Sequence, residues 1–83
     1  MPKTIFEGAN EVVVSVVRTA REEAGLTQAE VARRIGRDQS HVSLIERSQR
    51  RLDVVEFDKI ARAIGVDPVD LFARIARRLD PGS

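Results

Sequence analysis

The 83-residue sequence contains no cysteine, tryptophan or tyrosine, and it has only three phenylalanines and one histidine. Without cysteine the chain can form neither a disulfide nor a thiolate zinc site, and a reducing compartment is compatible with it. Bulky core residues are therefore scarce in a chain that is already near the lower size limit for burying a sufficient core alone. These shortages favour dimerisation as a route to further burial.

Long hydrophobic runs are missing as well. The longest, Val12–Val14, is far shorter than the roughly 20 residues that a membrane-spanning helix needs, and there is no signal peptide. The expected location is therefore the cytoplasm. No nucleophile–base set, metal-ligand cluster or glycine-rich phosphate loop is evident, so the sequence predicts no enzyme, metal, cofactor or small-molecule ligand.

The net charge is only +1, but positive charge is unevenly distributed along the chain. Residues 1–26 carry three basic and four acidic side chains, net −1, and residues 52–83 carry five basic and six acidic ones, also net −1. Residues 27–51 carry six arginines against three acids, net +3. Clustering matters more than the total for attraction to a polyanion, so the middle of the chain is the candidate nucleic-acid-binding part.

Hydrophobic periodicity and capping residues predict one compact all-α domain of five helices spanning residues 1–83. Residues 1–9 lack a sustained period and are predicted to form a flexible arm. Apolar residues recur with helical spacing over Asn10–Ala24, and Gly25 stands where a left-handed C-terminal cap is wanted. The first helix is therefore expected over Asn10–Ala24.

Capping signals place the other four helices. Thr27 and Glu30 have the spacing of a capping box at the start of the second helix, and Asp38 is a suitable N-cap for a third, about Gln39–Arg47. The fourth and fifth helices, about residues 54–79 together, are expected to close the core. Their starting signals are a capping box at Asp53–Glu56 and the N-cap and proline of Asp67-Pro68.

The stretch 28–47, QAEVARRIGRDQSHVSLIER, has the pattern of two short helices joined by a tight turn. Gly36 can take the positive φ of such a turn at low cost. Amides, hydroxyls and a cation face away from the apolar side, and this chemistry suits base edges and phosphates. The stretch therefore predicts a DNA-binding helix-turn-helix made by the second and third helices. Its apolar residues are Val31, Ala32, Ile35, Val42 and Ile45.

The segment LTQAEVARRIGRDQSHVSLIER, followed by RRLDVVEFDKIARAIGVDPVDLF, resembles the phage-repressor and Cro-type helix-turn-helix family, often called XRE. The resemblance covers roughly Val16 to Phe72. It implies a five-helix domain of the lambda-repressor type that binds double-stranded operator DNA, commonly as a two-fold dimer. Small single-domain members of this kind include phage repressors, controller proteins of restriction-modification systems and antitoxin-like autorepressors.

Two positions depart from the family pattern. Arg37 stands in the turn where the family generally has a small apolar residue, and Ser48 stands where a glycine usually closes the recognition helix. Serine adopts the left-handed conformation poorly, so the third helix is expected to run on or to end differently. The path of residues 49–51 depends on that ending.

A recognition helix enters the major groove by its N-terminal end, which here carries Gln39, Ser40, Ser43 and Leu44. Glutamine can bond adenine at both N6 and N7, and an apolar side chain such as Leu44 can meet a thymine methyl or simply pack. The resemblance implies that Gln28 acts together with Gln39: one reads the base, while the other braces it and touches a phosphate. These five residues are the predicted base contacts.

Backbone phosphates are expected to be contacted by residues at the edges of the same segment. Arginines there position a protein on DNA without reading its sequence. The open alternative is that the arginines pair with Asp53 and Glu56 at the surface. Glu46 is expected to be structural, bonding Arg33 or Arg34 or backbone groups. The predicted phosphate contacts are Thr27, His41, Arg47, Arg50 and Arg51.

The predicted dimer interface is Phe72, Ile75 and Leu79, because the last helix is more apolar than closing a core requires. The open alternative is that Phe72 and Ile75 only complete the monomer core. The leading functional hypothesis is a transcriptional regulator, a repressor or autoregulator, that binds a near-palindromic operator as a homodimer. A protein-interaction module of the same fold, such as an antitoxin or adaptor, is the alternative.

Overall fold

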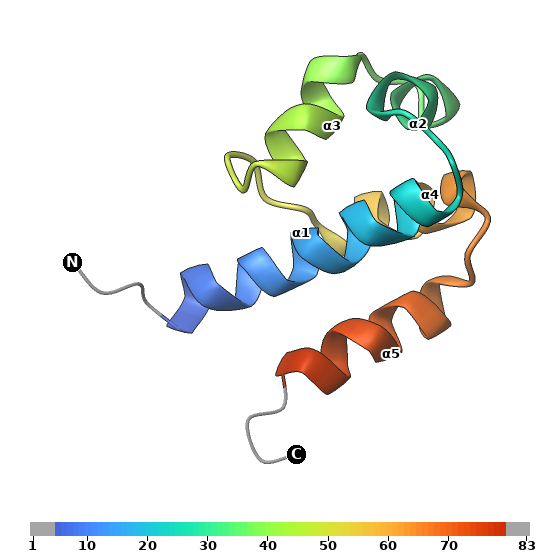
Figure 1. Cartoon of the computed structure of the whole chain (residues 1–83). Coiled ribbons are helices and arrows are strands. Elements are labelled where there is room, and N and C mark those ends of the chain that lie inside the picture. The colour runs from blue at the N-terminus through green and yellow to red at the C-terminus, as the bar shows by residue number, and fades with distance from the viewer. Residues whose placement is uncertain (1–4, 80–83) are drawn as a thin grey trace.

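The structure, a computed structural model, describes residues 5–79. Within them the chain forms five α-helices and no strand: α1 (Ile5–Glu23), α2 (Gln28–Arg34), α3 (Gln39–Glu46), α4 (Val54–Ile64) and α5 (Pro68–Leu79). Helix α1 runs through the middle, with α2 and α3 on one side and α5 on the other (Figure 1). The predicted all-α, five-helix architecture is confirmed.

The start of α1 differs from the prediction. The helix begins at Ile5 instead of Asn10, so residues 5–9, predicted to form an arm, are helical. Residues 1–4 of that predicted arm lie outside the described residues. Gly8 falls within the helix, where glycine costs roughly 1 kcal/mol relative to alanine, and this weak helix propensity is why the sequence pattern missed the first turns.

The local capping signals act largely as predicted. The Thr27 hydroxyl accepts a hydrogen bond from the Glu30 N–H at 3.1 Å, and the Glu30 carboxylate accepts one from the Thr27 N–H at 2.9 Å. Asp38 accepts from the N–H of His41 and so caps α3. These contacts satisfy backbone donors that the first turn of a helix leaves without partners. Both helices of the 28–47 stretch therefore begin where the sequence indicates.

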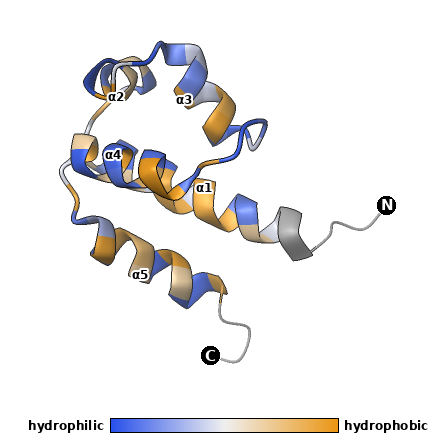
Figure 2. Cartoon of the chain, turned by 180° about the vertical axis from the view of Figure 1, so that it is seen from behind, coloured by the Kyte–Doolittle hydropathy of each residue, from blue (hydrophilic) through white to orange (hydrophobic). Residues whose placement is uncertain are grey.

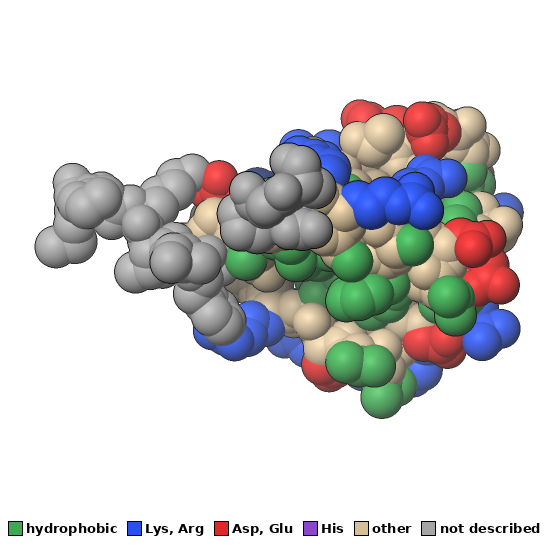
Figure 3. All heavy atoms as spheres, turned by 90° about the horizontal axis from the view of Figure 1, so that it is seen from below, with side chains coloured by type: hydrophobic (Ala, Val, Ile, Leu, Met, Phe, Trp, Pro, Cys, Tyr) green, Lys and Arg blue, Asp and Glu red, His purple; other side chains and the backbone are tan. Residues whose placement is uncertain are grey.

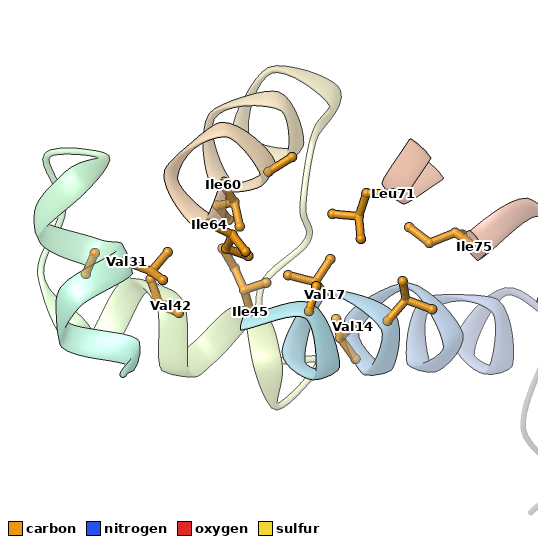
Figure 4. Packing of buried hydrophobic residues seen from close by; sticks show 13 residues of the cluster. Val14, Val17, Val31, Val42, Ile45, Ile60, Ile64, Leu71 and Ile75 are labelled. Carbon is orange, nitrogen blue, oxygen red and sulfur yellow. The ribbon is translucent and has the colours of Figure 1, made fainter. Parts of the chain in front are cut away.

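The core is aliphatic and lies where α1 meets α3, α4 and α5. Apolar side chains from all five helices point toward one another in it (Figure 4), while polar residues occupy the outer faces of the helices (Figure 2). The buried residues are Val14, Val16, Val17, Ala20, Val31, Ala32, Val42, Ile45, Ile60, Ala61, Ile64, Leu71 and Ile75.

Ile75 is a correction to the predicted dimer interface. Its side chain is only 1% exposed and belongs to the core, because the face of α5 that carries Leu71 and Ile75 packs on α1. Phe72 lies on the adjoining face and is 55% exposed, and Leu79 is also exposed. Of the three predicted interface residues, Phe72 and Leu79 therefore lie at the surface, and Ile75 lies in the core.

Candidate nucleic-acid interface

Helices α2 and α3 form the predicted helix-turn-helix, and Gly36 makes the turn possible. Gly36 has φ +75°, and the next N–H, that of Arg37, donates to the carbonyl of Ala32 at 2.9 Å. This bond closes the end of α2 in the left-handed cap geometry that glycine favours. Arg37 is exposed, so its departure from the family pattern does not disturb the packing of the turn.

The N-terminal turn of α3 presents polar side chains to solvent. Gln39 and Ser40 are exposed, whereas Ser43 and Leu44 are half-buried. The Ser40 hydroxyl donates to the Asp38 carboxylate at 2.7 Å, so it has only lone pairs left to offer a ligand. Gln39 is therefore the side chain in this turn with both donor and acceptor capacity directed outward.

A chain of hydrogen bonds connects Gln39 to the protein interior. Gln39 Nε2 donates to Gln28 Oε1 at 3.4 Å, and Gln28 Nε2 donates to Glu46 Oε1 at 3.0 Å. A carboxylate can only accept, so Glu46 fixes which end of the Gln28 amide faces it. The Gln28 oxygen must then face Gln39, which leaves Gln39 with its own Oε1 and one N–H for an external partner.

Glu46 is the buried anion at the end of this chain, with a side chain only 3% exposed. Arg21 of α1 donates to both of its oxygens, from Nε at 2.7 Å and from Nη2 at 2.9 Å. Arg18, also on α1, lies 3.6 Å from the same carboxylate and donates to the backbone carbonyl of Glu46. Two arginines thus hold the C-terminal end of α3 against α1.

The prediction that Glu46 bonds Arg33 or Arg34 is wrong. Arg34 points toward α4 instead, where its Nη1 donates to the carbonyl of Ala63 at 2.7 Å, and Arg33 is exposed. The reason is that α1 packs directly on α3 and supplies the nearer cations. Arg34 instead joins α2 to the C-terminal end of α4.

Hydrogen bonding keeps Glu46 ionised despite its burial. Burial alone would raise the pKa of its carboxyl group, but the hydrogen bonds from Arg21 and Gln28, with the charges of Arg21 and Arg18, hold that pKa below its ordinary value. The hydrogen bond to Glu46 correspondingly raises the pKa of Arg21. Both groups are therefore charged at neutral pH, and the bidentate pair is intact.

Helix α3 ends as though Ser48 were the glycine of the family pattern. Ser48 has φ 59°, its N–H donates to the carbonyl of Ile45 at 3.0 Å, and the N–H of Gln49 donates to the carbonyl of Leu44 at 2.8 Å. This pair of bonds is the Schellman arrangement of a left-handed helix end. The expectation that α3 runs on or ends differently is wrong, because the two hydrogen bonds offset the strain of a left-handed serine.

Replacing Ser48 with glycine is expected to raise the free energy of unfolding by about 1 kcal/mol, because the left-handed conformation costs a residue with a Cβ roughly that amount. Urea unfolding of the two proteins measures the difference. The matched control is Ser43→Gly, within α3, which should lower stability by about 0.5 kcal/mol because glycine is a poor helix former. A Ser48→Gly protein no more stable than the wild type would contradict the assignment of strain to Ser48.

The basic corner, defined here as Arg47, Arg50 and Arg51, follows the recognition helix. All three side chains are exposed. Arg50 lies 3.8 Å from the Glu56 carboxylate, so for this residue the predicted surface pairing is present. Thr27, also exposed, uses its hydroxyl as an acceptor in the α2 capping box. These predicted phosphate contacts thus flank both ends of the helix-turn-helix.

The side chain of His41 is less exposed than that of a typical phosphate contact. Its side chain is 11% exposed, and Nε2 lies 2.5 Å from Oε2 of Glu56 on α4. Glu56 donates its N–H to Asp53 at 2.8 Å, as a capping box requires, but its carboxylate turns to His41. Only half of the predicted second capping box is therefore formed, and the other half becomes a link between α3 and α4.

Comparison with known proteins settles the family. A family model described as Helix-turn-helix matches residues 17–71, more than half of the chain. The solved structure of an XRE-family like protein from Pseudomonas syringae pv. tomato str. DC3000 is 40% identical, with a TM-score of 0.83, and the match covers 89% of this chain and 90% of that one. The chain belongs to the XRE family.

Two further relatives of this XRE-family chain bear regulatory names. The HTH-type transcriptional regulator y4dJ of Sinorhizobium fredii (strain NBRC 101917 / NGR234) is 43% identical over 51 residues, which are 61% of this chain and 66% of that protein. The restriction-modification controller protein C.Esp1396I is 27% identical, with a TM-score of 0.79, over 86% of this chain and 93% of its own. A related structure shows that controller as a tetramer with its natural 35-base-pair operator.

An apolar groove lies on another face of the XRE-family fold, between α4 and α5, with a volume of about 620 Å³. Phe57 and Phe72 meet edge to face within it, with ring centroids 6.3 Å apart. Seen from below, exposed apolar side chains gather on this side of the molecule with charged ones around them (Figure 3). The sequence indicates no pocket here, although it does indicate an apolar surface on the last two helices, to which Val54, Val55 and Val69 could add. The exposed large apolar residues are Val54, Val55, Val69, Phe72 and Leu79.

Sequence reasoning also missed two residues that support the interface, Arg18 and Arg21 of α1, and it missed the contact of Glu56 on α4 with His41. Arg18, Arg21 and Glu56 all lie outside the 28–47 stretch. Their contacts depend on how distant helices pack, and no local sequence pattern predicts them. In the described residues no helix could span a membrane and no cluster of metal-ligating side chains occurs.

Proposed function

We propose that the protein is a cytoplasmic, sequence-specific DNA-binding transcriptional regulator, a repressor or autoregulator, that binds operator DNA with α3 in the major groove. The observation that carries this proposal is the chain from Gln39 through Gln28 to Glu46. A base-reading side chain must be held in one orientation before it meets the base, and a buried carboxylate provides that. A solvated surface glutamine would need no such support.

The orientation of Gln39 specifies the kind of base that it suits. The open groups are one acceptor, Oε1, and one N–H donor, since the other N–H is engaged by Gln28. In the major groove adenine offers a donor at N6 and an acceptor at N7 side by side, whereas guanine offers two acceptors. Adenine is therefore the proposed partner of Gln39, with Ser40, Ser43 and Leu44 contacting neighbouring bases.

Phosphate contacts are assigned to the edges of the helix-turn-helix. The basic corner follows α3, His41 lies in the first turn of α3, and Thr27 lies at the start of α2. Such contacts supply affinity and register without reading sequence. Their number sets the salt dependence, at about 0.9 of a unit in the slope of log K against log salt for each neutralised phosphate.

A homodimer that uses the α4–α5 groove completes the proposal. The exposed apolar residues Phe72, Val69 and Val54 form a continuous face with the groove, and a two-fold axis would place one copy's face on the other's. Two recognition helices in such a dimer contact half-sites about 34 Å apart, which makes the operator a near-palindrome. The controller protein seen as a tetramer on operator DNA supports this assembly.

Selection of bound duplexes from a random DNA pool tests the proposal directly. The expected result is enrichment of a short near-palindrome with adenine at one position of each half-site. Failure to enrich any sequence, together with recovery of a stable complex with another protein, would contradict the proposal and favour the protein-interaction alternative. Enrichment of a single, non-repeated half-site would contradict only the dimer.

Replacing Gln39 with alanine is expected to cost about 1–3 kcal/mol of binding free energy at one base pair of each half-site, and to remove the preference for adenine there. Fluorescence anisotropy with the selected duplex and with duplexes changed at that pair measures both effects. Gln49→Ala, the same change outside the hydrogen-bond chain, is the control and should leave base preference as it was. A Gln39→Ala protein that retains the adenine preference would contradict the role of Gln39.

A further inference from the structure

A cluster of three side chains joins the recognition helix to α4 and is not used by the proposed base contacts. Its members are His41 on α3, Arg50 in the segment after α3, and Glu56 on α4. Oε2 of Glu56 lies 2.5 Å from Nε2 of His41 and 3.8 Å from Nη2 of Arg50. A single carboxylate thus holds two groups that belong to the DNA-binding side of the molecule.

The three side chains differ in exposure. His41 and Glu56 are 11% and 14% exposed, while Arg50 is 47% exposed. The histidine–carboxylate contact is therefore largely shielded from water, which strengthens it, whereas the arginine contact is longer and solvated, which weakens it. Of the two partners, Arg50 is the one that can leave Glu56 without exposing a buried group.

The charge on His41 decides how strongly Glu56 holds Arg50. A neutral imidazole can give the carboxylate one N–H but no positive charge, so Arg50 is then the cation that balances Glu56. A protonated imidazole supplies both the N–H and the charge at the shorter distance. Among ordinary side chains only histidine changes charge between about pH 5 and pH 8, and His41 is the chain's one histidine.

Other charged groups adjoin this cluster at the starts of α3 and α4. On its own helix His41 has Asp38, and hydrogen bonds from Ser40 and from the His41 N–H lower the pKa of the Asp38 carboxyl, so this group keeps its charge as the pH falls. Arg37 adjoins Asp38 in the turn. On α4, the Asp53 carboxylate is engaged by the Glu56 N–H.

We propose that Glu56 is a positioning residue that transfers its hold from Arg50 to His41 when the imidazole is protonated, and thereby releases Arg50 to a DNA phosphate. This inference rests on the proposed DNA-binding function. Protonation then increases DNA affinity and adds a phosphate contact. Because the α3–α4 link tightens at the same time, the recognition helix keeps its place while the arginine moves.

The expected effect is a change in salt dependence with pH. One additional phosphate contact steepens the slope of log K against log salt by about 0.9, which is roughly an eightfold change in affinity for each tenfold change in salt. The wild-type slope should therefore be steeper by about 0.9 at about pH 5.5 than at about pH 8. A generally weakened or loosened structure would reduce affinity without this coupling of slope to pH.

Binding of the selected duplex is measured over a salt series at both pH values, with wild type, His41→Gln, Glu56→Gln and Asp70→Asn. His41→Gln should give the shallow slope at both pH values, because it carries no titratable charge there. Glu56→Gln should give the steep slope at both, because a neutral amide does not hold Arg50. Asp70→Asn removes an exposed carboxylate outside the cluster and should retain the wild-type change.

The outcomes separate the inference from the function on which it rests. No binding to any duplex at either pH overturns the proposed function. Binding with the same slope at both pH values in the wild type, or an unchanged pH effect in His41→Gln, overturns the inference alone. A shallow slope for His41→Gln together with a steep slope for Glu56→Gln supports the inference. A purely structural role would weaken DNA binding by both variants and change their slopes in the same direction.

A measurement on the unaltered protein guards against variants that do not fold. If protonation strengthens DNA binding, then DNA binding must take up protons, because linkage is reciprocal. Calorimetric titrations of the selected duplex near pH 6.5, repeated in buffers of different ionisation enthalpy, measure that uptake. Net uptake that disappears at about pH 8 supports the inference, and no uptake at either pH overturns it.

Discussion

An Arg21→Ala protein is expected to unfold with a free energy about 3–5 kcal/mol lower than that of the wild type. The change removes the bidentate partner of the Glu46 carboxylate, which is 3% exposed, and leaves it only Gln28 and the longer contact with Arg18. Breaking a buried ion pair from one side costs that much because a charge stays buried and poorly paired. For a small domain this is a large part of the total stability. The expected result is therefore a protein that is partly unfolded at room temperature.

Urea unfolding followed by circular dichroism measures this loss. Arg62→Ala is the matched control, because Arg62 pairs with Asp58 at an exposed site on one helix, and such pairs contribute less than about 1 kcal/mol. Addition of Glu46→Ala to Arg21→Ala should recover part of the loss, since the unpaired carboxylate is then gone. A single Arg21→Ala change costing no more than the control would show that the pair does not hold α3 on α1.

The same pair predicts how stability varies with acid. The pKa of Glu46 is lowered in the folded protein, so its contribution is fully present above the unfolded value of about 4.3 and is lost as pH falls through the folded value. Wild type should therefore lose stability below about pH 4 more steeply than the doubly substituted protein, which lacks both charges. If the free energies of unfolding of the two proteins fall equally steeply below about pH 4, the lowered pKa of Glu46 is contradicted.

The sequence predicts well those features that depend on neighbouring residues. Thr27 and Glu30 lie one helical turn apart, and Gly36 needs only its own conformational freedom, so the helix-turn-helix and its boundaries follow from local chemistry. The contact between Gln28 and Gln39 follows from the family resemblance, which carries packing information that a single pattern lacks.

The features that sequence reasoning missed depend on contacts between distant helices. Glu46 could meet a cation from α1 or from α2, and only the crossing of α1 beneath α3 decides for Arg21. His41 and Glu56 each had a local role available, and they contact each other only because α3 and α4 pack together at that point. Ser48 shows the converse, since the surrounding hydrogen bonds impose a conformation that its own preference disfavours.

The division of α5 into two faces gives the second large prediction. Ile75→Ala is expected to lower the free energy of unfolding by about 2–5 kcal/mol, because it opens a cavity in a core that cannot collapse fully around it. Phe72→Ala, on the exposed face, should cost the monomer far less but should weaken the proposed dimer. Urea unfolding, with sedimentation measured at several protein concentrations, separates the two effects.

The two variants distinguish a core residue from an interface residue through concentration. Loss of a core side chain lowers stability at every protein concentration, whereas loss of an interface side chain lowers it mainly where the wild type is dimeric. Ile75→Ala that folds normally while failing to dimerise would contradict its place in the core. Phe72→Ala that dimerises as the wild type does would show that the exposed face of α5 is not the dimer surface. Phe72 and Ile75 both line the α4–α5 groove, but only Phe72 is exposed. The exposed face at Phe72 should therefore govern the proposed dimerisation, and with it the spacing of two recognition helices on DNA.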